Sequence, residues 1–160
     1  MYEVPFGPTI RNVIDMAGGV GGTGRLQAVL LGGAAGSFVL PKELDTPLTF
    51  EGTRAIGATL GSGVVMLFDD SVDLKQILLR IAAFFRSETC GQCVPCRVGT
   101  IRQEEALQRL VQRKPLGSNE QESTLLKEMA QAMRDASICG LGQTASGAIL
   151  SAIERWGLFS

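Results

Sequence analysis

The spacing of hydrophobic residues changes along the chain, and this change divides it near residue 70. Before that point, short apolar or alternating segments are separated by glycine-rich turns, a pattern typical of strands. The predicted strands are Leu26 to Leu31, Ser37 to Leu40, Thr53 to Thr59 and Val64 to Phe68. A short helix is predicted before them, because the apolar residues of Thr9 to Met16 fall on one face until Gly18-Gly19 ends the pattern.

After residue 70 the apolar residues recur every three or four positions, which predicts helices. The first is expected to run from a cap at Asp70 or Ser71 to about Phe85. Three more are expected at Val98 to Lys114, from Asn119 (with Glu122 at capping-box spacing) through Met133, and at Gln143 to Trp156. Four helices joined by short loops predict a bundle. The fold class is therefore α+β, with a small sheet domain at 1–70 and a four-helix domain at 71–160.

Several side chains are given structural roles. The aromatic residues at helical spacing are expected in the core: Phe84, Phe85 and Trp156. Five glutamates are expected on solvated helix faces: Glu104, Glu105, Glu120, Glu122 and Glu128. Asp69-Asp70 is interpreted as a strand exit and helix cap. Gly19 to Gly24 matches the dinucleotide pattern G-x-G-x-x-G, but it follows a predicted helix and precedes a predicted strand, so a plain turn is expected.

Composition narrows the classes of function. The 160 residues are 45% hydrophobic and 19% charged, as in globular proteins. No apolar run approaches the roughly 18 residues of a membrane span, and Met1 to Pro5 lacks the plan of a signal peptide, so a cytoplasmic chain without a membrane span is expected. A net charge of −1 argues against a nucleic-acid partner. The absence of histidine removes histidine-based catalysis and mixed Cys/His zinc sites.

The four cysteines all lie in the helical half. Three are spaced by two residues in the stretch 90–96, which lets their thiolates face one centre, and the fourth can approach from another loop. Three close ligands plus one distant ligand are a recurrent way to hold an iron-sulfur cubane. The predicted ligands of one [4Fe-4S] cluster are Cys90, Cys93, Cys96 and Cys139. Arg97 and the amides around Gly91 and Gly140 are candidates for tuning its potential.

Other interpretations of the cysteines remain. A four-cysteine zinc site is possible, although structural zinc usually has two separated Cys-x-x-Cys pairs. Two disulfides would need an oxidising compartment, for which the sequence has no signal peptide. Reduced core cysteines are a further alternative, although their glycine and proline neighbours favour loops.

The stretches Ser87 to Thr100 and Ser137 to Ala145 resemble the C-terminal part of the flavin-bearing subunit of NADH dehydrogenase. That family includes the respiratory complex I subunit and relatives in NAD-dependent formate dehydrogenases and NAD(P)-linked hydrogenases. The resemblance implies that the four cysteines ligate a [4Fe-4S] cluster in a helical bundle, and that 1–70 is a β-grasp-like (soluble-ligand-binding) domain. Gly99 to Arg102 and Cys139 to Thr144 look more like the formate dehydrogenase and hydrogenase relatives.

The family's large N-terminal domain, which carries FMN and NADH, has no counterpart in this sequence. The chain is therefore expected to be a fragment or a reduced paralogue, and NADH oxidation is implied only for a parent complex. The expected function is single-electron relay in an NAD(P)H-linked oxidoreductase, with other redox subunits or a flavin domain as partners. The alternative is a zinc-stabilised interaction module without redox activity. The sequence leaves open whether the chain is itself an enzyme, and whether its first domain binds a ligand or a partner subunit.

Overall fold

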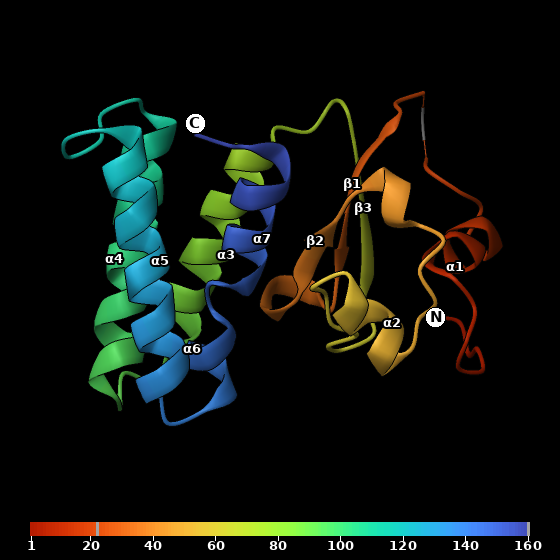
Figure 1. Ribbon diagram of the computed structural model, residues 1–160, viewed down its shortest axis with the longest axis horizontal. Helices are drawn as coiled ribbons and strands as arrows, with labels where there is room; N and C mark the ends of the chain where they lie inside the picture. Colours follow the sequence, from red (N-terminus) through yellow and green to blue (C-terminus); the bar gives the residue numbers. More distant parts are fainter. Residues whose placement is uncertain (22, 160) are drawn as a thin grey trace. The chain divides into compact units, whose positions relative to one another are not determined.

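The structure is a computed structural model that describes residues 1–21 and 23–159 (Figure 1). The chain forms two compact units, Met1–Val72 and Asp73–Ser160. The described strands lie in the first unit, together with two short α-helices, and the second unit is helical. This segregation of sheet and helices confirms the predicted α+β class.

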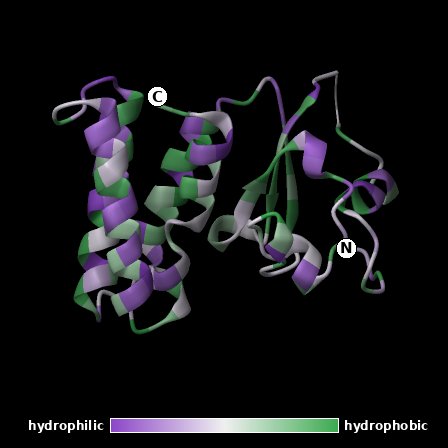
Figure 2. Ribbon diagram, viewed as in Figure 1, coloured by the Kyte–Doolittle hydropathy of each residue, from purple (hydrophilic) through white to green (hydrophobic). Residues whose placement is uncertain are grey.

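The first unit is built on an antiparallel sheet in the order β2-β1-β3. Its strands are β1 (Leu26–Leu31), β2 (Ser37–Val39) and β3 (Val65–Asp69), close to three of the predicted strands. Val29 of β1 lies opposite Val39 and Leu67, so apolar side chains share one face. The buried core combines Val29, Leu31 and Val39 with Ile10, Ile14 and Leu44. Figure 2 shows the strands as predominantly hydrophobic.

Short helices precede and connect the strands of this sheet. Helix α1 (Ile10–Met16) begins where predicted, because Thr9 and Asn12 form a capping box. Two 3₁₀ turns, η1 (Gly33–Ala35) and η2 (Pro41–Glu43), flank β2. The glycine run at 19–24 lies between α1 and β1, in the predicted order, and its Gly22 is outside the described residues.

The predicted strand at Thr53 to Thr59 is wrong, because this segment begins inside helix α2 (Phe50–Ala55). Thr49 caps the helix by accepting a hydrogen bond from the Gly52 N–H at 2.9 Å. The Thr53 hydroxyl donates to the Thr49 carbonyl at 2.9 Å, which satisfies it inside the helix. Local capping therefore outweighs the β-preference of the threonines.

In the described part of the second unit there are four longer helices and one short helix. These are α3 (Leu74–Glu88), α4 (Val94–Val111), α5 (Asn119–Ala136), α6 (Gly140–Thr144) and α7 (Gly147–Trp156). Helix α4 packs against α3, α5 and α6, and α7 packs against α3. Figure 2 shows hydrophilic and hydrophobic residues alternating along α4 and α5, as expected for helices with one buried face.

Several predicted helix boundaries are displaced. Asp73 caps α3 rather than Asp70 or Ser71, and Ser118 with Gln121 forms the capping box of α5 rather than Asn119 with Glu122. Helix α4 begins at Val94 rather than Val98, since Pro95 is tolerated in a first helical turn. The helix predicted at Gln143 to Trp156 is divided into α6 and α7.

Some side chains do not lie where they were predicted. Glu104 and Glu122 are buried rather than solvated, because arginines reach them: Arg86 contacts Glu104 and Arg109 contacts Glu122. Phe85 is buried as predicted, whereas Phe84 is 47% exposed and Trp156 is half-buried. Asp69 ends β3 and accepts a hydrogen bond from the Ser71 N–H, while Asp70 pairs with Arg25.

Candidate metal centre

The four cysteines of the second unit line one cavity of about 280 Å³. Three come from the loop between α3 and α4 and from the first turn of α4, and the fourth comes from the link between α5 and α6. The lining consists of Cys90, Cys93, Cys96 and Cys139 with Glu88, Thr89, Gln92, Ile138 and Leu141. The structure therefore brings together the side chains that the sequence proposed as ligands, although 43 positions separate Cys96 from Cys139.

The backbone conformation of residues 90–96 places the first three thiols at the cavity. Gly91 has φ +71°, in the left-handed region that favours glycine, so the chain turns sharply between Cys90 and Cys93. Cys93 is the N-cap of α4, and Cys96 lies in its first turn and is 5% exposed. The Arg97 guanidinium donates to the Gly91 carbonyl at 3.3 Å, which places a cation beside this turn, as expected.

The fourth thiol is held by the close approach of α6 to α4. Cys139 is the N-cap of α6. A Cβ on Gly142 would lie 2.8 Å from the Cβ of Cys96 and 2.3 Å from the Ser137 hydroxyl oxygen, so only glycine allows this approach. Gly140 is the first residue of α6 and, unlike Gly91, does not have a positive φ.

Hydrogen-bond donors lie beside the sulfurs of Cys93 and Cys96. The Thr89 hydroxyl and the Cys96 sulfur are 3.1 Å apart. The pKa of the Cys93 thiol is lowered, chiefly by the backbone N–H of Ile138 and next by that of Cys96, while burial opposes the shift. These donors stabilise a thiolate, which is the form that binds a metal.

The cavity of about 280 Å³ has room for a group larger than a single ion. No three Cys, Asp or Glu side chains of the described residues converge as one metal ion would require. A zinc ion would draw four sulfurs to about 2.3 Å from a single point. A cubane instead gives each thiolate its own iron, so its ligands stand around a core, as these four stand around the cavity. None of the four cysteines forms a disulfide.

Three supporting residues were missed by the sequence interpretation: Thr89, Ser137 and Gly142. Thr89 and Ser137 lie within two positions of a cysteine, which was the available signal. The role of Gly142 depends on a contact between two helices, and no local pattern shows such a contact.

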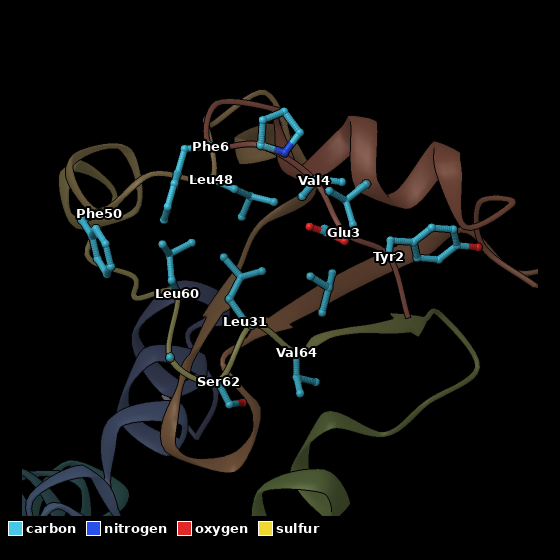
Figure 3. Close-up of a pocket in the computed structure, with 15 residues that line it drawn as sticks. Tyr2, Glu3, Val4, Phe6, Leu31, Leu48, Phe50, Leu60, Ser62 and Val64 are labelled. Carbon is cyan, nitrogen blue, oxygen red and sulfur yellow. The ribbon is translucent and has the colours of Figure 1, made fainter.

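A second, larger pocket lies in the first unit and has no cysteine. Its volume is about 540 Å³, and its walls come from the N-terminal segment, β1, α2 and the turn before β3. Figure 3 shows Phe6, Leu31, Leu48, Phe50 and Leu60 pointing toward a common space. Glu3 is the one charged residue among the lining side chains. Such a surface suits an apolar contact and offers no metal-ligating set.

Comparison with known proteins agrees with the cysteine geometry. The family model described as NADH-ubiquinone oxidoreductase-F iron-sulfur binding region matches residues 76–157, a range that contains all four cysteines. Among the described residues, no helix is long and apolar enough to cross a membrane.

Relatives of known name extend the match over almost the whole chain. The NADH-quinone oxidoreductase F subunit of Mycobacterium tuberculosis (strain ATCC 25618 / H37Rv) is 34% identical over 155 residues, covering 97% of this chain and 34% of that protein. The NADP-reducing hydrogenase subunit HndC of Solidesulfovibrio fructosivorans is 33% identical over 157 residues, covering 98% and 31%. A crystal structure of NAD⁺-reducing [NiFe]-hydrogenase in the H₂-reduced state superposes with a TM-score of 0.82 at 31% identity, covering 99% and 26%. The chain thus spans about a third of the length of these curated relatives.

Proposed function

Because the chain belongs to the NADH-ubiquinone oxidoreductase-F iron-sulfur binding region family, we propose that its four cysteines hold one [4Fe-4S] cluster. The ligands would be Cys90, Cys93, Cys96 and Cys139. When bound, such a cluster takes up and releases one electron at a time. The observation that carries the proposal is the single cavity lined by all four thiols.

The chain's own residues would bind the cluster and offset part of its negative charge. The N–H groups of Ile138 and Cys96 offset the negative charge of the Cys93 sulfur, and the Thr89 hydroxyl donates to Cys96 when Cys96 is a thiolate. Ile138 and Leu141 contribute apolar side chains to the lining of the cavity, while Cys90 and Cys139 are exposed. The chain would thus act as an electron relay rather than as a site where substrate bonds change.

The parent assembly is an NAD(P)H-linked oxidoreductase of the NADH dehydrogenase, hydrogenase or formate dehydrogenase type. Two relatives of the chain are named as subunits, one of an NADH-quinone oxidoreductase and one of an NADP-reducing hydrogenase. FMN and NAD(H) would bind to other parts of that assembly, since the chain spans only about a third of these relatives. Its partners would be other redox subunits or a flavin-bearing domain.

The test is anaerobic purification followed by quantitation of iron, sulfide and zinc. We expect about four iron and four sulfide per chain. Each Cys→Ser variant should lose most of the iron, whereas Ser87→Ala, an exposed position near the end of α3 that does not line the cavity, should keep it. Stoichiometric zinc without iron would replace the proposal with the zinc-stabilised module.

A second measurement tests the relay. The isolated chain with its cluster should be reduced by dithionite but not by NADH alone. Reduction by NADH without a flavin partner would contradict the placement of the FMN and NAD(H) sites elsewhere in the assembly.

A further inference from the structure

The Ser137 hydroxyl is a buried polar group without a partner. Ser137 is 6% exposed, and its Oγ is the one buried side-chain nitrogen or oxygen atom of the described residues with no hydrogen bond. The backbone of Ser137 is fixed on both sides, since its N–H donates to the Met133 carbonyl at 3.1 Å and its carbonyl accepts from Gln143 at 3.0 Å. A buried hydroxyl without a partner is unfavourable and calls for an explanation.

Other buried hydroxyls of the chain have protein partners. Thr53 donates to the Thr49 carbonyl, Thr100 to the Cys96 carbonyl at 2.9 Å, and Ser146 to the side chain of Gln103. Ser137 differs from them in its position, because it lies two residues before Cys139, at the end of α5. Its missing partner is therefore to be sought on the side of the cysteines.

The hydroxyl lies among the cysteines rather than elsewhere in the helical unit. A Cβ on Gly142 would come within 2.3 Å of the Ser137 oxygen and 2.8 Å of the Cys96 Cβ, so both flank the same small space. The hydroxyl is also a neighbour of the Cys93 sulfur, toward which it can donate. In the described structure its geometry falls short of a hydrogen bond to that sulfur.

We propose that Ser137 donates its O–H to the Cys93 sulfur when the cluster is bound, and thereby raises the cluster's reduction potential. This inference rests on the proposed function, and Ser137 acts as a positioning and tuning residue rather than a ligand. An added electron increases the negative charge on the sulfurs, so a donor to sulfur stabilises the reduced form more than the oxidised form. Removing the donor should make reduction harder.

The test is the midpoint potential of the cluster in the full chain, measured by EPR-monitored titration. Ser137→Ala should lower the equilibrium constant for reduction about tenfold, a shift of about 59 mV to more negative potential for a one-electron couple. Thr53→Val is the control, because it removes a buried hydroxyl of the first unit whose partner is the Thr49 carbonyl. That control should keep the wild-type potential.

A second pair of variants separates the hydroxyl from packing. Ser137→Thr and Ser137→Val have the same shape and differ in whether a hydroxyl is present. We expect the Thr variant to have a higher potential than the Val variant, even if Ser137→Ala does not retain the cluster. Equal potentials in this pair, or a wild-type potential in Ser137→Ala with full iron and sulfide, would overturn the inference. Absence of iron from the wild-type chain would instead overturn the proposed function.

Discussion

The two units of the chain differ in what they bury. Among the described residues, the first unit buries one polar side chain, Thr53, and its own helix satisfies the hydroxyl. Over the residues that the structure describes, the second unit buries six polar or charged side chains: Thr100, Gln103, Glu104, Glu122, Ser137 and Ser146. Apolar cores tolerate repacking, whereas a buried polar group depends on a partner at one particular position.

This difference indicates which unit depends on the precise positions of individual side chains. The apolar core of the first unit, around Val29 and Leu31, needs little more than matching volume. In the second unit, Gln103 joins α4 to the segment before α7 by donating to the Ala145 carbonyl at 3.1 Å and accepting from Ser146. Such bonds fix the helices in one arrangement. The cysteine cavity depends on that arrangement, because its thiols come from separate segments.

The largest effect is expected from breaking a buried ion pair of the second unit. Arg109 Nε donates to Glu122 at 3.1 Å, its Nη2 donates to the same carboxylate, and the Leu116 N–H adds a bond at 2.8 Å. Glu122→Ala should cost about 3 kcal/mol of unfolding free energy, near the lower end for buried pairs, because Arg109 stays partly exposed.

Urea denaturation followed by the fluorescence of Trp156, the single tryptophan, measures this change in the second unit. Glu120→Ala, an exposed position one residue after the start of the same helix, is the control and should change stability by less than about 1 kcal/mol. Equal stability of the two variants would mean that buried polar pairs do not distinguish the units.

The first unit should respond to a loss of apolar volume instead. Leu31 is 1% exposed and belongs to the core around the sheet. Leu31→Ala should destabilise the unit by about 2–3 kcal/mol, toward the lower end for such changes, because the neighbouring pocket lets the site relax. Hydrogen exchange of the β1 amides measures this loss, with Met66→Ala, a 44% exposed residue of the same sheet, as the control. Iron content should stay unchanged, and its loss would show that the cysteine site depends on the first unit.

Sequence patterns predicted the elements that repeat over many residues. The strand Leu26–Leu31 and the long helices were found because their apolar periodicity is strong. The segment at Thr53 was assigned to a strand because residue preference favours strands there, whereas the Thr49 cap decides the outcome. The spacing of the cysteines, taken alone, already indicated that they share one site.

What the sequence did not predict depends on distant contacts. Glu122 has the pattern of a solvated glutamate, and only the reach of Arg109 from the neighbouring helix makes its burial favourable. Likewise, Gly142 was interpreted as part of a motif, while its role is to let α6 approach Cys96. Pairings of this kind arise from helix packing, which a single sequence does not display.

The close approach at Gly142 offers a sharper test of the geometry in the second unit. A Cβ there would meet the Ser137 side chain and Cys96, so Gly142→Ala should push α6 away from α4. We expect a net loss of about 1–2 kcal/mol, because the steric cost exceeds the gain of up to about 1 kcal/mol in helix propensity. Iron content should fall as Cys139 moves away.

Gly140→Ala is the matched control for Gly142→Ala. It lies in the same short helix, and a Cβ there meets no atom within 4 Å. Unfolding of the metal-free protein should show Gly140→Ala to be neutral or slightly stabilised. If both variants lose stability equally, the contact between α6 and Cys96 is not what holds the fourth ligand.

The smallest expected effect is a loss of folding stability at low pH. It compares a buried carboxylate with an exposed one. Hydrogen bonds from Arg109 lower the pKa of Glu122, and a hydrogen bond from Arg11 lowers the pKa of Asp45 in the first unit. For a lowered pKa, the stabilisation is complete above the unfolded value, about 4.3 for Glu and 3.9 for Asp, and it is lost as the pH falls through the folded value. Both units should therefore lose stability below about pH 4.

Added salt distinguishes the exposed carboxylate of Asp45 from the buried carboxylate of Glu122. The Asp45 side chain is 71% exposed and that of Glu122 is 0% exposed, so ions screen the pair of Asp45 much more strongly. Raising the salt concentration should abolish the acid sensitivity due to Asp45, measured as the difference from Asp45→Asn by hydrogen exchange. The corresponding difference between wild type and Glu122→Gln, measured by Trp156 fluorescence, should persist in salt. Salt ions reach the buried pair only when the helices separate. If salt removed both differences equally, Glu122 would behave as a surface charge, and the contrast between an apolar unit and a unit with exact buried polar contacts would fail.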